Sequence, residues 1–181
     1  MSIILYPFLV IINLIGTILT FPLAFVLALL KSDQDGWLDN GTKWGTGPRL
    51  YKWLSWFQTP DNSLDGDHGF QEKHNPCWWS KVQWLWRNPF YGFAVKYLHG
   101  TDGIKYKGYL KCNEQNHGYL FVYGQGLFQF VLFTGLFGKT LYLNLGWNIR
   151  ALVDPQYVND PTNAPFIANY PATFAFSPRL V

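Results

Sequence analysis

The hydrophobic pattern begins with an uninterrupted apolar run over residues 1–30. No Asp, Glu, Lys or Arg occurs in this run, and Lys31 ends it. About 20 predominantly apolar residues are enough for a helix to cross the hydrocarbon core of a bilayer. The pattern therefore predicts a transmembrane anchor, either one helix or a helical hairpin bent at Gly16 or Pro22. A cleaved secretory signal fits less well, because no basic residue precedes the run and no A-x-A site closes it.

A Gly-rich stretch over residues 31–49 predicts a linker with turns. Apolar positions then recur at helical spacing over 50–58 and 77–87, and an aromatic segment over 89–98 predicts a further helix after Pro89. Tryptophan concentrates at bilayer interfaces, so we expect these short amphipathic helices to lie there. Packing on the domain's own core is the alternative. The residues expected at the interface are Trp53, Trp56, Trp78, Trp79, Trp84 and Trp86.

After residue 100 the pattern changes to a period of two, which is typical of strands. The segments that follow predict an antiparallel meander of about four strands, over 104–112, 119–123, 127–136 and 140–147. A rival interpretation makes 118–138, which has no charge, a second transmembrane helix, but its glycines and aromatic residues favour strands.

The Pro-rich tail, residues 151–181, predicts an extended segment that wraps the domain and ends in an edge strand around Phe174 and Phe176. Together these elements predict an α+β fold. Its parts are an anchor over 1–30, a linker over 31–49 and one small domain over 50–181.

Composition limits the partners of the domain. All 14 Lys and Arg and all 11 Asp and Glu follow residue 30, so the net charge of +3 belongs to the domain. This charge is too small to favour nucleic acid and is compatible with an anionic bilayer. Aromatic residues make up 19% of the chain, with 9 Trp. The two cysteines, Cys77 and Cys112, form no metal motif by spacing, and a disulfide between them would need an oxidising compartment.

The segment TPDNSLDGDHGFQE, residues 59–72, carries the most suggestive chemistry. Counted from Asp61, its oxygen-bearing side chains follow the spacing of a calcium-binding EF-hand loop, with Gly66 at the sixth position. The candidate ligands for Ca²⁺ or another divalent cation are Asp61, Ser63, Asp65, Asp67 and Glu72. The alternative is a turn-rich loop whose carboxylates cap backbone amides. No enzyme motif, nucleophile elbow or phosphate-binding loop occurs in the chain, so no catalytic residue is proposed.

Four motifs in the same order resemble a family of uncharacterised tailed-phage and prophage proteins. They are TPDNSLDGDHGF at 59–70, VQWLWRNPFYGF at 82–93, LNLGWNIR at 143–150 and FAFSPRL at 174–180. The resemblance implies a membrane-anchored protein in an infected or lysogenic bacterium, and it implies no activity.

The expected function is that of a phage-encoded accessory protein at the host inner membrane, acting by contacts with lipid or with a host or phage membrane protein. Superinfection exclusion or modulation of a host process are the roles expected. Basic residues after the anchor, Lys31, Lys43 and Arg49, favour a cytoplasmic C-terminal domain. The alternatives are a membrane-tethered cation-binding module or enzyme built on residues 61–72, and a holin-like lysis protein.

Overall fold

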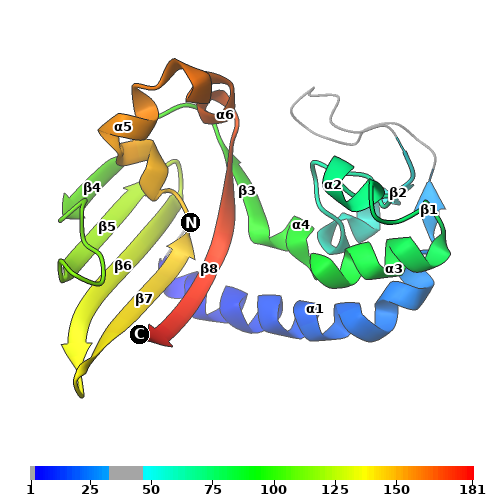
Figure 1. The fold of residues 1–181 in the computed structure, drawn as a ribbon, viewed down its shortest axis with the longest axis horizontal. Coiled ribbons are helices and arrows are strands. Elements are labelled where there is room, and N and C mark those ends of the chain that lie inside the picture. The colour runs from blue at the N-terminus through cyan, green and yellow to red at the C-terminus, as the bar shows by residue number, and fades with distance from the viewer. Residues whose placement is uncertain (1–2, 33–46) are drawn as a thin grey trace. The chain divides into compact units, whose positions relative to one another are not determined.

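The computed structural model describes residues 3–32 and 47–181, and the chain forms two compact units. One unit, here called the helical unit, is Phe8–Val95, and the other, the sheet unit, combines Met1–Pro7 with Lys96–Val181. Most of the predicted linker, residues 33–46, lies outside the described part of the chain. Figure 1 shows the elements of both units, which are described separately.

The apolar run forms one continuous helix. After a 3-10 turn, η1 (Ile3–Leu5), the helix α1 (Tyr6–Leu27) runs for 22 residues through Gly16 and Pro22 without a break (Figure 1). Pro22 removes one backbone donor, and the other hydrogen bonds of so long a helix outweigh that loss. The predicted hairpin is therefore wrong, and the predicted single long apolar helix is confirmed.

The side of α1 that packs on the helical unit carries small residues. Gly16, Thr20, Ala24 and Ala28 are buried at four-residue spacing. Ala24 and Ala28 belong to a core that includes Leu50, Leu54, Leu64, Val82 and Leu85. Most of the large apolar side chains of α1 are exposed, and Leu27 at its C-terminal end is buried in the core. This distribution is the reverse of that of an ordinary soluble helix, which buries its large apolar residues.

Short elements complete the helical unit. They are β1 (Lys31–Ser32), β2 (Arg49–Leu50), η2 (Lys52–Phe57), α2 (His68–Gln71), α3 (Trp78–Arg87) and α4 (Tyr91–Ala94). The predicted Trp-rich helices correspond to η2 and α3. The helix predicted over 89–98 is wrong beyond Ala94, because Val95–Leu98 forms strand β3 of the sheet. Long-range pairing overrides the local apolar pattern there, which short aromatic runs leave ambiguous.

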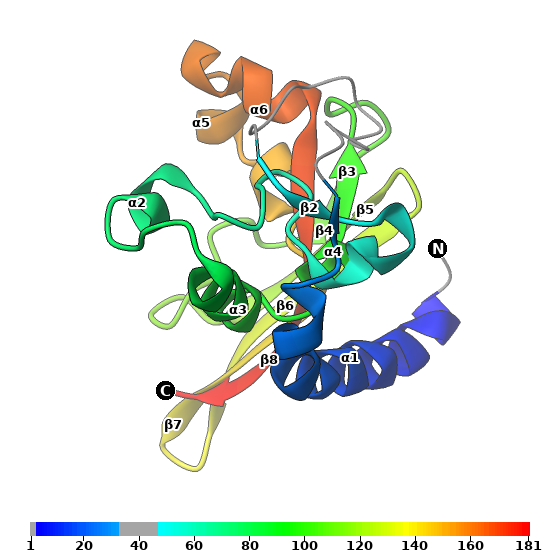
Figure 2. The ribbon, with the colours of Figure 1, turned by 90° about the vertical axis from the view of Figure 1, so that its right-hand side faces the viewer.

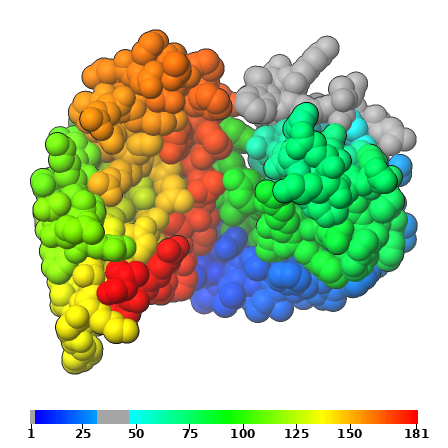
Figure 3. Space-filling model, viewed as in Figure 1, coloured from blue at the N-terminus to red at the C-terminus, as the bar shows by residue number. Residues whose placement is uncertain are grey.

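The sheet unit contains a six-stranded sheet in the order β3-β8-β7-β6-β5-β4. The predicted meander is confirmed, with antiparallel pairing between consecutive strands. Its strands are β4 (Lys105–Gly108), β5 (Gly118–Gly124), β6 (Leu127–Leu136) and β7 (Lys139–Trp147). The rival second transmembrane helix over 118–138 is therefore wrong. The β6–β7 turn projects from the end of the sheet (Figure 3, yellow), and its Phe137 is 94% exposed.

The tail is more ordered than the sequence predicts. It forms four short helical turns and then the strand β8 (Tyr170–Leu180), which lies between β3 and β7 and is not an edge strand. Because β3 has four residues and β8 has eleven, β3 pairs only part of β8, which makes prolines in this strand tolerable. The helical turns are η3 (Arg150–Val153), α5 (Pro155–Val158), η4 (Pro161–Asn163) and α6 (Ala164–Ala168). Figure 2 shows α5 and α6 together at one end of β8.

Candidate functional site

A pocket of about 440 Å³ lies on one face of the sheet, entirely within the sheet unit. Strand register explains which side chains reach it. Along β6, Gln129, Val131 and Phe133 share a face because side chains alternate, and they lie opposite Gly146, Asn144 and Tyr142 of β7. The pocket is thus built on the two longest neighbouring strands of the meander.

Gly146 keeps the position opposite Gln129 free of a side chain. Its φ is +100°, and a Cβ there would collide with the Phe128 carbonyl oxygen. Only glycine accepts both conditions without strain. This glycine belongs to the sequence LNLGWNIR, whose two asparagines and arginine also line the pocket.

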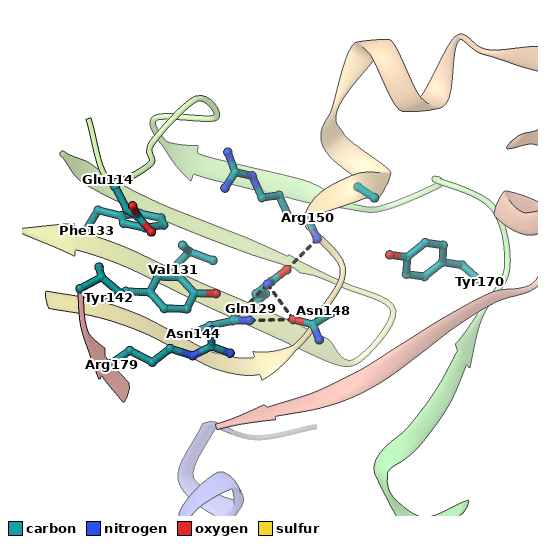
Figure 4. Close-up of a pocket in the computed structure, with 12 residues that line it drawn as sticks. Glu114, Gln129, Val131, Phe133, Tyr142, Asn144, Asn148, Arg150, Tyr170 and Arg179 are labelled. Carbon is teal, nitrogen blue, oxygen red and sulfur yellow. Dashed lines mark hydrogen bonds between the residues drawn. The ribbon is translucent and has the colours of Figure 1, made fainter. Parts of the chain in front are cut away.

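Three amide side chains form a hydrogen-bonded network in the pocket (Figure 4). The Gln129 amide nitrogen donates to the Oδ1 atoms of Asn144 at 2.8 Å and of Asn148 at 3.2 Å. Asn144 also donates to Asn148 Oδ1 at 2.8 Å, and Asn148 donates to the Thr173 hydroxyl at 2.8 Å. Gln129 is 4% exposed and Asn144 9%, so both amide side chains are buried, and both make hydrogen bonds within the network.

The same network holds the chain as it leaves β7. The Gln129 oxygen accepts hydrogen bonds from the backbone nitrogens of Ile149 at 2.8 Å and Arg150 at 2.6 Å. The Arg150 guanidinium in turn donates to the carbonyls of Cys112, at 3.3 Å, and Leu110. The buried Gln129 thereby fixes the backbone of Arg150, whose positively charged side chain lines the pocket.

A second cation comes from β8. Arg179 lies opposite Tyr142 in the strand register, and its guanidinium is 5.7 Å from the centre of the Tyr142 ring. Figure 4 shows Arg150 and Arg179 on opposite sides of the amide network. Among the described residues that line the pocket, Glu114 is the only carboxylate side chain. The lining side chains therefore carry a formal charge of +1.

Aromatic rings border the pocket. The ring centres of Phe133 and Tyr142 are 4.8 Å apart across β6 and β7. Tyr170, at the start of β8, also lines the pocket, and burial, followed by the nearby Tyr157, raises the pKa of its hydroxyl. Tyr170 therefore stays protonated at neutral pH and is able to donate a hydrogen bond.

The predicted metal ligands are engaged elsewhere. Asp67 caps α2 by accepting from the Phe70 backbone nitrogen at 2.8 Å, Asp65 pairs with Lys81 at 2.6 Å, and Glu72 is 3.2 Å from His68. Ser63 accepts from the Asp65 backbone, and one buried oxygen of Asp61 has no hydrogen-bond partner among the described residues. Within residues 3–32 and 47–181, no three His, Cys, Asp or Glu side chains are close enough to hold a metal ion.

The Asp-rich segment, residues 59–72, surrounds a positively charged side chain of the protein, that of Arg49. Arg49 is 1% exposed, and its guanidinium donates to the carbonyls of Pro60 at 3.4 Å and Asn62 at 3.2 Å. Gln58 closes the loop by bonding both the Leu50 backbone nitrogen and the Asn62 carbonyl. The interpretation of this segment as a turn-rich loop with capping carboxylates therefore describes these contacts.

The six tryptophans predicted at an interface lie in different environments. Trp53, Trp56, Trp78 and Trp79 are exposed by 76%, 57%, 43% and 44%, and Trp86 is half-buried. Trp84 is 3% exposed and packs against Phe70, so it belongs to the core of the helical unit.

None of the residues that line the pocket was predicted as a site residue, although Asn144, Asn148 and Arg150 lie in the motif LNLGWNIR and Arg179 lies in FAFSPRL. A usable signal was present, because Gln129 and Asn144 interrupt strands that are otherwise apolar (LFQFVLF and LYLNLGW). A buried polar side chain in such a strand requires partners, and their identity depends on strand pairing.

Fold and pocket together define an α+β protein with a long apolar N-terminal helix and a polar pocket on an antiparallel sheet. The sequence model of a family of unknown function, DUF7338, matches residues 1–178. The chain belongs to this family. Neither the curated proteins nor the solved structures that were compared with it gave a match.

Proposed function

We propose that this protein is a membrane-attached accessory protein that acts through contacts with lipid or with a membrane protein. The packing of α1 carries the proposal. Ile3–Leu27 is long and apolar enough to cross a membrane, and only 17% of its most apolar 18-residue window is buried. A core helix of a soluble protein would be mostly buried. The packing of Ala24, Leu27 and Ala28 in the core of the helical unit argues against a segment that is removed as a signal.

The exposed side of α1 is large enough to bind a bilayer. Its large apolar side chains are 38–62% exposed and include Phe8, Ile11, Leu14, Ile15, Ile18 and Val26. Full burial of one such side chain contributes about 1.5–3 kcal/mol, so half that gain for five of them is on the order of 5 kcal/mol. Soluble monomers rarely leave a continuous apolar surface of this kind uncovered.

The attachment of both helix ends supports an orientation along the membrane surface. The Tyr6 hydroxyl donates to the Ala175 carbonyl, and the Tyr6 ring lies 5.3 Å from those of Phe128 and Phe174 in the sheet unit. At the other end, Leu27 and Ala28 belong to the core of the helical unit. A helix that crossed the bilayer would hold its two ends on opposite sides.

If α1 crossed the bilayer, the chain would have to cross it a second time to return from the helical unit to the sheet unit. The chain passes from the helical to the sheet unit at Val95–Lys96, and Ile3–Leu27 is the one candidate span in the described part of the chain. Since the described residues contain no second candidate span, we place both ends of α1 on the same side. We therefore propose that α1 lies in the membrane interface with its exposed side in the lipid, in place of the predicted transmembrane crossing.

Three tryptophans, Trp56, Trp78 and Trp86, lie beside α1 at different points along its length. Trp78 and Trp86 donate from their ring nitrogens to the carbonyls of Phe25 and Phe21, at 3.1 and 2.9 Å. Phe90 covers the helix near Gly16, and the Trp56 ring packs on Phe90. Gly16 lies nine residues before Phe25, which is about 13 Å along the helix axis at 1.5 Å per residue. Tryptophans spread along a helix axis suit a helix that lies in the interface, where all of them reach the headgroups.

The resemblance to tailed-phage and prophage proteins supports a bacterial inner membrane as the location and a host or phage membrane protein as partner. Superinfection exclusion or modulation of a host process remain the roles that we propose. We also propose the cytoplasmic face of this membrane as the position of both units, the side that the sequence predicts for the C-terminal domain.

Flotation of the full-length protein with liposomes tests membrane attachment. We expect it to float with the vesicles and to resist carbonate extraction. Ile15→Asp should weaken partitioning by about tenfold, because a charge on the lipid side of α1 is costly. The matched control, Phe137→Asp, changes an exposed apolar residue of the β6–β7 turn and should leave partitioning unchanged. Recovery of the unaltered protein in the soluble fraction would overturn the proposal.

A further inference from the structure

Hydrogen-bond accounting in the sheet pocket shows an excess of donors. Two backbone nitrogens, those of Ile149 and Arg150, donate to the Gln129 side-chain oxygen and so use both of its lone pairs. This assigns the nitrogen of the same amide as the donor to Asn144 and Asn148. The Asn148 oxygen already accepts from Gln129 and Asn144, so it too is saturated.

The amide groups of Asn144 and Asn148 have more N–H donors than the network uses. Asn144 uses one of its two amide hydrogens, on Asn148, and Asn148 uses one of its two, on Thr173. Each amide therefore retains an N–H without a partner in the network. A ligand that satisfies these two groups must present acceptors.

The two arginines have unused donors as well. Arg150 gives two hydrogen bonds to the backbone carbonyls of Cys112 and Leu110, out of five that a guanidinium offers. The Arg179 guanidinium stacks on Tyr142 and makes no hydrogen bond to another described residue. Neither arginine forms an ion pair with a carboxylate of the described chain. Unpaired guanidinium groups at a pocket are suited to planar or tetrahedral anions.

We propose that this pocket binds a small anionic molecule, with a carboxylate or phosphate group attached to an apolar or aromatic body. The anionic group bonds Arg179 and the free N–H groups of Asn144 and Asn148, and the positive charge of Arg150, on the other side of the amide network, adds to the attraction. The body packs on the side chains of Val131 and Phe133, which line the same face of β6. The volume of about 440 Å³ falls within the usual range for small-molecule sites.

This assignment is independent of membrane attachment, because every residue it uses belongs to the sheet unit. The anion could be a soluble metabolite or a lipid headgroup. Glu114 gives the pocket one negative group, so the ligand should carry no second anionic group on the Glu114 side.

Isothermal titration of the full-length protein in phosphatidylcholine nanodiscs, with phenyl phosphate as probe and phenol as its neutral counterpart, tests the proposal. We expect phenyl phosphate to bind at least about tenfold more tightly than phenol, because a hydrogen bond to a charged group is worth that factor. Arg179→Gln should weaken phenyl phosphate binding about tenfold and leave phenol unaffected. Arg179 is exposed at the end of β8, so this variant should fold.

Lys105→Gln is the matched control, since it removes one exposed positive charge on β4, outside the pocket. Unchanged binding in this variant supports the site. Equal weakening in both variants, or equal affinity for phenyl phosphate and phenol, would overturn it. Nanodiscs that contain phosphatidylglycerol separate the two sources of the anion. Competition by this lipid, sensitive to Arg179→Gln, identifies a headgroup as the ligand, and lack of competition identifies a soluble molecule.

Discussion

Replacement of Gln129 by leucine should destabilise the sheet unit strongly. The leucine fills a similar volume but leaves the backbone nitrogens of Ile149 and Arg150 without their acceptor. Ile149 is fully buried, so water cannot replace the lost bond there. Asn144 and Asn148 also lose the donor that bridges their oxygens.

The magnitude follows from the buried groups that lose partners. An unsatisfied buried donor or acceptor costs about 1–3 kcal/mol, and the released oxygens of the two asparagines are partly reached by water at the pocket. We expect a loss of about 3 kcal/mol in the free energy of unfolding, equivalent to a fall of roughly 6–12 °C in Tm for a chain of this size. Thermal and urea unfolding of the detergent-solubilised full-length protein, followed by circular dichroism, measure both quantities.

Gln156→Leu provides the control. Gln156 is exposed on α5 and its side chain makes no hydrogen bond to another described residue, so this substitution should change stability by less than about 0.5 kcal/mol. A loss below about 1 kcal/mol for Gln129→Leu would refute the network as the element that organises the pocket.

Three further predictions concern the helical unit and the cysteines. Arg49→Met should lower the free energy of unfolding by about 3 kcal/mol, because the carbonyls of Pro60 and Asn62 lose a buried donor. Urea titration measures this change, and an unchanged free energy of unfolding would show that the loop holds its shape without the guanidinium. Trp84→Ala should cost about 3–5 kcal/mol and Trp53→Ala less than about 0.5 kcal/mol, so similar losses would contradict their burial. Hydrogen bonds from Ser80, its backbone first, lower the pKa of the exposed Cys77 thiol, whereas burial raises that of Cys112. Iodoacetamide at pH 8 should therefore modify Cys77 well before Cys112, as followed by mass spectrometry, and equal rates would argue against this difference.

Local periodicity was sufficient for the long elements. The apolar run spans 30 residues and the alternating segments span five to ten, and α1, α3 and the four meander strands form where their patterns predict them. Short aromatic runs were not sufficient. The segment after Pro89 changes from helix to strand at Val95, because pairing in the sheet decides its conformation.

The pocket could not be derived from local pattern, because its parts meet through strand register. Gln129 and Asn148 are 19 residues apart, and Arg179 reaches the pocket only through the pairing of β8 with β7. In the aspartate-rich loop, residues 59–72, a local sequence signal was present, but the contacts in the structure differ from those that it predicts. Its spacing matches a calcium loop, yet the partner of Asp65 is Lys81 on α3, a contact that depends on tertiary structure.

The central claim, that α1 lies in the membrane interface, is tested most directly by the depth of spin labels along the helix. Phe8, Ile15 and Val26 share one exposed side of α1, and 18 residues at 1.5 Å each separate the outer two by about 27 Å. Single-cysteine variants at these positions, with Cys77 and Cys112 replaced by serine and alanine, carry nitroxide labels in phosphatidylcholine vesicles. Accessibility to oxygen and to a nickel chelate then gives the depth of each label. A helix in the interface holds all three labels at the same shallow depth, whereas one deep label between two shallow ones would show that the helix crosses the bilayer.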